Sequence, residues 1–160
     1  MSDTKYDENT RLRITYDILT KTPELEAAIQ LVQACPETQF VLDHISKPYI
    51  SKREMEPWKS LITELASFEN VSCKISGMVT EAKWNTWNDS DFAPYVDHII
   101  ESFSPQRIMF GSDWPVALLA TQSYSDVVRL AEKLTSQLSD SEKASFWGGH
   151  ATDKYKVTNQ

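Results

Sequence analysis

Hydrophobic residues along this chain follow two alternating spacings. Four short runs rich in β-branched and aromatic residues predict strands, at 12–19, 39–45, 71–76 and 107–112. After each run, apolar residues recur three and four positions apart, which predicts amphipathic helices. These helices fall within residues 25–32, 58–65, 92–103 and 127–138. Such a succession is typical of a parallel sheet with right-handed crossovers, so we expect an α/β fold of four βα units and exclude all-α and all-β folds.

Local signals mark the ends of two helices. Thr22 and Pro23 place a capping hydroxyl before a proline, so we expect the first helix to begin there. Ser139 and Glu142 form a capping box, which predicts a fifth and shorter helix. We expect the two glycines at 148–149 to end this helix.

The third predicted strand has one apolar and one polar face. Val71, Cys73 and Ile75 share one face, while every second residue from Ser72 to Ser76 shares the other. A sheet covered by helices on both faces normally buries apolar side chains on both. The polar face therefore suggests the interior of a barrel close to a functional site.

Composition and charge narrow the class of protein. The chain has 160 residues, 41% of them hydrophobic, which suits one globular domain. Its net charge is -7 and no stripe of basic residues occurs, so we expect no nucleic-acid partner. No apolar run reaches the roughly 18 residues needed to cross a bilayer, and the polar segment 1–11 is expected to be disordered rather than a secretory signal. We therefore expect a cytoplasmic protein without a membrane partner, with Cys35 and Cys73 reduced.

Ionisable and polar residues gather where the predicted strands end. In parallel α/β folds the carboxyl ends of the strands carry the ligand-binding and catalytic groups. The residues at these ends are Asp17, Asp43, His44, Lys74, Ser76, Ser112 and Asp113. Asp113 is interpreted as a general base or metal ligand, or as an aspartate that only caps a turn; the apolar wall and fixed turn supplied by Trp114 and Pro115 favour a functional role.

Three further positions keep alternative interpretations. His44 is either a buried histidine bonded to the backbone or a tuned acid, carbonyl polariser or ligand within a charged cluster. Lys74 is costly to bury alone, so it has either a carboxylate neighbour or an anionic ligand. The long loop 77–91 suggests a lid or binding loop, in which Trp84 and Trp87 stack on a sugar ring or anchor the loop. Sequence motifs of serine hydrolases, P-loop NTPases and dinucleotide-binding proteins are absent.

Four segments together resemble a known family. They are LDHISKP (42–48), VSCKISGMVTEAKW (71–84), RIMFGSDWPV (107–116) and FWGGHATDKY (146–155). In this order and spacing they resemble the C-terminal half of amidohydrolase-related lactonases, a branch that includes L-fuconolactonase-like and L-rhamnonolactonase-like enzymes of the amidohydrolase superfamily. The resemblance covers roughly residues 12–157. It implies the C-terminal half of a (β/α)8 TIM barrel, with the four strands found here as its last four.

The resemblance also implies roles for individual residues. Asp113 matches the aspartate that activates the hydrolytic water, alone or with one divalent metal such as zinc, for which it would be a ligand. His44 matches a histidine that orients or polarises the substrate. Lys47, Lys74 and Trp114 match positions that line the pocket, and we include Ser76 with them as substrate-binding. The implied reaction is hydrolysis of a small-molecule sugar-acid lactone.

Three features of the chain depart from the family pattern. The paired HxH histidines of the first barrel strand are absent, and four βα units cannot close a barrel that needs eight strands and about 250 residues. We therefore expect residues 1–160 to form one truncated amidohydrolase-related domain with little activity alone. Three interpretations stay open: a piece of an active lactonase, a non-catalytic sugar-acid-binding protein, and a half-barrel that self-associates through exposed sheet edges. His150 also stands where the family more often has asparagine.

Overall fold

The computed structural model describes residues 14–157, so the predicted disordered segment 1–11 lies outside the described residues. Four parallel strands form one sheet in the order β1-β2-β3-β4. The strands are β1 (Thr15–Ile18), β2 (Gln39–Leu42), β3 (Val71–Ile75) and β4 (Ile108–Phe110). Each strand lies beside its neighbour in sequence, as in a succession of βα units. This arrangement confirms the predicted α/β fold of four βα units.

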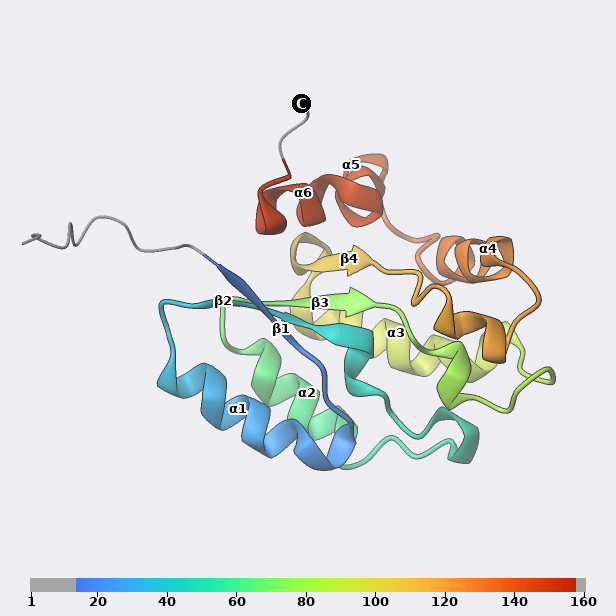
Figure 1. Cartoon of the computed structure of the whole chain (residues 1–160), viewed down its shortest axis with the longest axis horizontal. Coiled ribbons are helices and arrows are strands. Elements are labelled where there is room, and N and C mark those ends of the chain that lie inside the picture. The colour runs from blue at the N-terminus through green and yellow to red at the C-terminus, as the bar shows by residue number, and fades with distance from the viewer. Residues whose placement is uncertain (1–13, 158–160) are drawn as a thin grey trace, which may run out of the picture.

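Helices lie on both sides of the sheet. Those described within 14–157 are α1 (Leu25–Ala34), α2 (Trp58–Ala66), α3 (Asp89–Phe103), α4 (Tyr124–Leu134), α5 (Asp140–Ala144) and α6 (His150–Tyr155). Figure 1 shows α1, α2 and α3 along one face and the short helices α5 and α6 on the opposite side. None of the helices in this part of the chain is long and apolar enough to span a membrane.

The face of the sheet toward α1, α2 and α3 is apolar. The strand register places Phe40 beside Val71 and Leu42 beside Cys73, and all four are almost fully buried. These side chains join the apolar stripes of the three helices in one core that includes Trp58, which is 1% exposed. Burial of apolar area at about 25 cal/mol per Å² is the main term that holds the helices on this face.

The opposite face carries the polar residues of β3, as the parity of the third strand predicts, together with buried Val41 and Met109, and α6 covers part of it (Figure 1). Thr15 donates from Oγ1 to the carbonyl of Lys154, and Ser72 Oγ lies 2.9 Å from Nε2 of His150. Tyr155 donates from its hydroxyl to Asp17 at 2.6 Å. The C-terminal helix therefore bonds polar groups of β1 and β3, among them the hydroxyl of the fully buried Ser72.

Two predicted boundaries near the candidate site are wrong. The predicted strand 39–45 ends at Leu42, because the chain then enters a run of left-handed residues. The first helix begins at Leu25, after a 3-10 turn (Thr22–Glu24) whose N-cap is Lys21. Thr22 is buried and its hydroxyl has no hydrogen-bond partner among the described residues, so it points into the core instead of capping the turn.

The end of the fifth helix also differs from the prediction. The capping box at Ser139 is present, but α5 ends at Ala144 and a wide turn (Ser145–Gly149) follows. Gly148 breaks the helical geometry there, and the chain continues directly into α6. The two glycines therefore lie in a bend between two helices and do not end the helical segment. The contacts of α6 with the sheet hold the chain in this second helix.

Candidate active site

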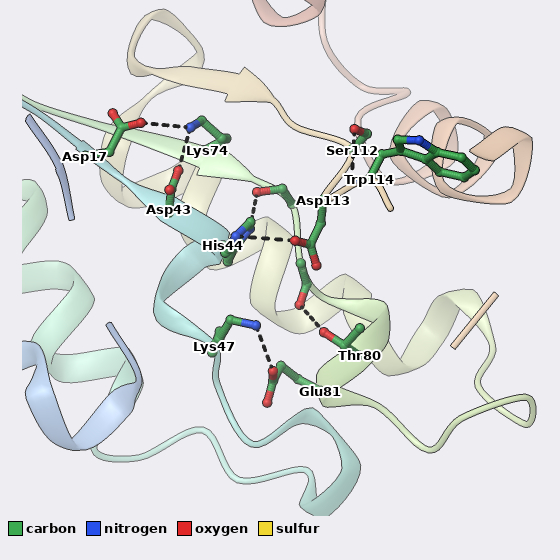
Figure 2. Close-up of polar contacts among 12 residues, drawn as sticks. Asp17, Asp43, His44, Lys47, Lys74, Thr80, Glu81, Ser112, Asp113 and Trp114 are labelled. Atoms are coloured by element: carbon green, nitrogen blue, oxygen red, sulfur yellow. Dashed lines mark hydrogen bonds and ion pairs between the residues drawn. The ribbon is translucent and has the colours of Figure 1, made fainter. Parts of the chain in front are cut away.

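The carboxyl ends of three strands bring His44, Ser76 and Asp113 together. Figure 2 shows His44 and Asp113 facing each other. The Nδ1 atom of His44 lies 2.8 Å from Ser76 Oγ, and its Nε2 atom lies 3.5 Å from Asp113 Oδ1. The His44 and Asp113 side chains are only 16% and 9% exposed. Residues distant in sequence thus form one compact Ser-His-Asp row, because parallel strands end at the same edge of the sheet.

The environment of this row favours a neutral imidazole and a reactive carboxylate. Burial lowers the pKa of His44, although the negative charges of Asp113 and Asp43 oppose the shift. The Oδ2 atom of Asp113 is buried and has no hydrogen-bond partner among residues 14–157. A buried carboxylate oxygen without a partner is unusual in a native protein and is available to accept a proton or bind a ligand atom.

A left-handed turn holds His44 in place. Residues 44–47 all have positive φ, between 44° and 57°, a conformation that costs L-residues roughly 1–2 kcal/mol each. Packing sustains this turn, since Ile45 is fully buried and Trp58 donates from Nε1 to the carbonyl of Ile45 at 2.7 Å. Strained backbone of this kind occurs where the surrounding structure fixes a functional side chain. Sequence reasoning did not find the turn.

Two glycines allow the side chains of the row to approach the backbone. Gly77 has a φ of +61°, and a Cβ atom placed there would lie 2.6 Å from the His44 ring. A Cβ atom at Gly111 would lie 2.8 Å from side-chain atoms of Lys74 and Ser76. No larger residue fits either position without displacing these side chains. Sequence reasoning did not single out these glycines, although each adjoins a predicted site residue.

Lys74 lies in a separate ionic cluster on the polar face. Its Nζ atom is 2.5 Å from Asp43 Oδ1 and 3.5 Å from Asp17 Oδ2. Burial by itself lowers the pKa of Lys74, but the hydrogen bond to Asp43 and its negative charge outweigh burial and raise it. Of the two interpretations for Lys74, the structure therefore shows the carboxylate neighbour.

Tyr155 of α6 completes this cluster, and sequence reasoning did not single it out. The Lys74 ammonium lies 5.5 Å from the centre of its ring, and its hydroxyl donates to Asp17. Burial, followed by the hydrogen bond to Asp17, raises the pKa of Tyr155 to about 12. Tyr155 therefore stays a neutral donor. The signal that could have found it is its place in the last of the four family-like segments.

The remaining predicted residues lie beside the row rather than in it. Lys47 pairs with Glu81 at 3.2 Å, a partner that sequence reasoning did not name. Trp114 is 53% exposed, and in Figure 2 its ring points away from Asp113. That ring packs edge-on against Tyr124. A role of Lys47, Lys74, Ser76 or Trp114 in substrate binding remains a prediction.

The long loop is fixed by its own tryptophans. Trp87 donates from Nε1 to the carbonyl of Ala120 at 2.8 Å, and its ring packs edge-on against Phe92. Trp84 donates from Nε1 to the carbonyl of Thr80 and is half exposed. Trp87 thus anchors the loop to a distant part of the chain, as the anchoring interpretation requires, whereas the bond of Trp84 stays within the loop.

The described residues hold neither a zinc site nor a large pocket at this edge. A catalytic zinc ion needs three protein ligands. No group of three or more His, Cys, Asp or Glu side chains within 14–157 could hold a metal ion, so the donor set here does not fit zinc by itself. A hollow that includes Ser76, Gly77 and Ser112 in its lining has a volume of about 10 Å³, enough for about one water molecule.

The fold and the row define an α/β protein of the half-barrel type, with an Asp-His pair at the carboxyl edge of its sheet. Residues 4–157 match the family model described as amidohydrolase. The chain is 36% identical over 152 residues to the L-fucono-1,5-lactonase of Burkholderia multivorans, a match covering 89% of this chain and 51% of the relative. It is 31% identical over 147 residues to the L-fucono-1,5-lactonase of Burkholderia ambifaria, covering 90% and 50%.

A solved structure gives the same result. The crystal structure of an amidohydrolase from Burkholderia multivorans with bound zinc superposes with a TM-score of 0.83 at 37% identity. The match covers 90% of this chain and 53% of that chain. The chain belongs to the amidohydrolase family, and its sheet is half of the TIM barrel of that family. It spans about half the length of the curated relatives it matches.

Proposed function

We propose that this chain carries the water-activating half of a site that hydrolyses a sugar-acid lactone. The observation that carries the proposal is the Asp113 carboxylate, whose Oδ2 atom is buried without a partner among residues 14–157 while Oδ1 faces Nε2 of His44 at 3.5 Å. A carboxylate placed in this way is suited to act as a general base. The substrate class comes from the relatives, which are L-fucono-1,5-lactonases.

The proposed reaction uses Asp113 and His44 in different roles. Asp113 takes a proton from water, and the water oxygen attacks the carbonyl carbon of the lactone. The neutral imidazole of His44 donates from Nε2 to the carbonyl oxygen as negative charge develops there. The ring C–O bond then breaks, and Asp113 returns the proton to the departing alkoxide, which gives the open hydroxy acid. The 3.5 Å separation from Asp113 exceeds an ordinary hydrogen bond, so Nε2 is available to a substrate oxygen.

Zinc has no step in this proposal. Among the described residues, His44 and Asp113 supply two donor groups at this edge, one fewer than a catalytic zinc site requires. The zinc bound to the Burkholderia multivorans relative belongs to a chain about twice as long. We therefore include added zinc as an arm of the assay.

An activity assay tests the proposal. The purified chain is mixed with L-fucono-1,5-lactone, with and without zinc, and release of acid is followed. We expect Asp113→Asn to lower kcat/KM by about 10²- to 10⁴-fold, the usual contribution of a general base. Asp97→Asn makes the same chemical change at an exposed position of α3 and is expected to leave the rate unchanged. Equal rates for the two variants, or no acid release by the unaltered chain under either condition, would overturn the proposal.

One observation favours a second candidate function, self-association of the half-barrel. The strand β1 lies at an edge of the sheet, and apolar side chains in and beside it are exposed. Ile14 is 66% exposed, Tyr16 54% and Leu19 64%. An exposed apolar edge strand is a template for pairing with another chain.

A further inference from the structure

We propose that Ser76 is a positioning residue for His44: its hydroxyl donates to Nδ1 and so fixes the imidazole proton on Nε2, the nitrogen that faces Asp113. The catalytic meaning of this role rests on the proposed function, whereas the placement of the proton does not. In this proposal Ser76 acts on His44, whereas the sequence predicts that it contacts the substrate.

The first argument is the hydroxyl proton of Ser76. Ser76 is 2% exposed, and among the described residues His44 Nδ1 is the one hydrogen-bond partner of its hydroxyl, at 2.8 Å. A hydroxyl has one proton to donate and two lone pairs that accept. If Nδ1 carried the proton, the buried Ser76 proton would have no acceptor among the described residues. Donation from Ser76 to an unprotonated Nδ1 avoids this desolvation penalty.

The second argument comes from the other side of the ring. Asp113 Oδ1 lies 3.5 Å from Nε2, and an ionised carboxylate only accepts hydrogen bonds. It therefore favours a proton on Nε2. Ser76 and Asp113 favour the same tautomer from opposite sides, and the shorter contact to Ser76 is expected to hold it when Asp113 is removed.

The third argument is that the ring is held in one orientation. The Gly77 backbone approaches the ring so closely that an added Cβ atom would lie 2.6 Å from its Cγ and Nδ1 atoms. Gly111, which directly follows the neighbouring strand β4, packs against Ser76, and a Cβ atom added there would lie 2.8 Å from Ser76 Cβ. Together with the left-handed turn at His44, these contacts keep Nδ1 on Ser76. The two imidazole nitrogens therefore keep separate roles.

The proposal has a consequence for the chemistry of the site. A neutral His44 that carries its proton on Nε2 presents a donor, as the proposed polarisation of a lactone carbonyl requires. The same proton occupies the lone pair that a metal ion would need at Nε2. Ser76 would thus favour carbonyl polarisation over metal binding by His44.

The tautomer of His44 can be measured directly. The chain has three histidines, so nitrogen-15 spectra of the imidazole rings of the full chain, recorded where histidine is neutral, are simple to assign. We expect a single Nε2–H tautomer for His44 in the unaltered protein. Asp113→Ala is expected to keep this tautomer because Ser76 remains. The double variant Asp113→Ala with Ser76→Ala is expected to relax to the mixture of tautomers of a free histidine.

The same strand offers a matched control. Ser72, four residues before Ser76, makes the equivalent hydroxyl-imidazole contact, with Nε2 of His150 at 2.9 Å. Ser72→Ala should therefore change the His150 signals and leave those of His44 unchanged. An Nδ1–H tautomer in the unaltered protein, or a mixture in Asp113→Ala alone, would show that Ser76 does not place the proton. These two spectra decide the question even if the Ser76 variants fail to fold.

The outcome is separable from that of the lactonase assay, since the spectra need no substrate. If the chain hydrolyses lactone, Ser76→Ala should lower kcat several-fold with little change in KM, as expected for a residue that acts through His44. If the unaltered chain shows no lactonase activity but its His44 carries the proton on Nε2, the proposed function is wrong and the positioning role of Ser76 still holds. A fall in affinity with unchanged kcat in Ser76→Ala would instead indicate substrate contact.

Discussion

At the scale of single residues, burial decides the protonation of the imidazoles. His44 and His150 each bond a buried serine hydroxyl of β3 or its carboxyl end, and burial is the largest cause that lowers both pKa values. Because the folded protein holds these rings neutral, the unfolded chain binds more protons than the folded one between the lowered pKa and the ordinary value of 6.5. The two histidines thus link the stability of the fold to pH.

We therefore expect the free energy of unfolding to fall as pH falls from 6.5 through the lowered pKa values, and to lose this dependence above 6.5. Each group contributes at most about 1.4 kcal/mol per pH unit in this window. Urea unfolding followed by circular dichroism at a series of pH values measures the slope. His150→Asn removes one of the two groups and should reduce the slope. An unchanged slope would contradict the assignment of this dependence to His150.

At the scale of elements, α6 differs in kind from the helices on the other face. The helices α1, α2 and α3 bury apolar stripes, whereas α6 approaches the sheet through polar contacts to β1, β2 and β3. Lys154 donates to Gln39 at 2.8 Å and Tyr155 to Asp17 at 2.6 Å. Directional hydrogen bonds rather than apolar burial therefore set the position of this helix.

Removal of the Tyr155 hydroxyl should measurably loosen α6. We expect Tyr155→Phe to lower the free energy of unfolding by about 0.5–1.5 kcal/mol, the range of one net hydrogen bond, because Asp17 keeps only its longer contact to Lys74. Urea unfolding measures the change. Tyr124→Phe is the matched control, since the Tyr124 hydroxyl has no hydrogen bond to another described residue and its ring is 46% exposed. Equal effects of the two substitutions would show that the hydrogen bond from Tyr155 to Asp17 does not stabilise the position of α6.

At the scale of the whole molecule, the described sheet has four strands where the barrel of its family has eight. The edge strand β1 exposes apolar side chains, and its outward backbone groups have no strand beside them within the described sheet. Charged side chains on an edge strand are a common means of preventing such pairing. The charged residue of β1, Asp17, contacts Lys74 and Tyr155, and its neighbour Tyr16 is uncharged and exposed.

If the half-barrel self-associates through β1, the average mass from light scattering is expected to rise with protein concentration. Tyr16→Lys places a charge on the β1 edge and should shift the protein toward monomer. Leu119→Lys introduces the same charge at a 56% exposed position remote in sequence from β1 and should not. A monomeric mass at every concentration for the unaltered chain would exclude self-association through this edge.

Much of the fold and part of the site followed from the sequence. The apolar spacing predicted four strands and their helices, because burial imposes a period of two on strands and 3.6 on helices wherever one face meets a core. Polar residues at the ends of the strands predicted the cluster in which His44 and Asp113 now face each other. The motifs around Lys74 and Asp113 carried the resemblance that the family match confirms.

Only the tertiary structure decided which of these groups are partners. The left-handed turn at 44–47 depends on burial of Ile45 and on the Trp58 hydrogen bond, neither of which leaves a local pattern. The pairing of Tyr155 with Asp17 joins residues 138 positions apart. Periodicity reports which face of an element is buried, whereas hydrogen-bond partners depend on how distant elements pack. The sequence by itself therefore determined the βα architecture and the edge that carries the chemistry, and packing decided that His44 would lie between Ser76 and Asp113.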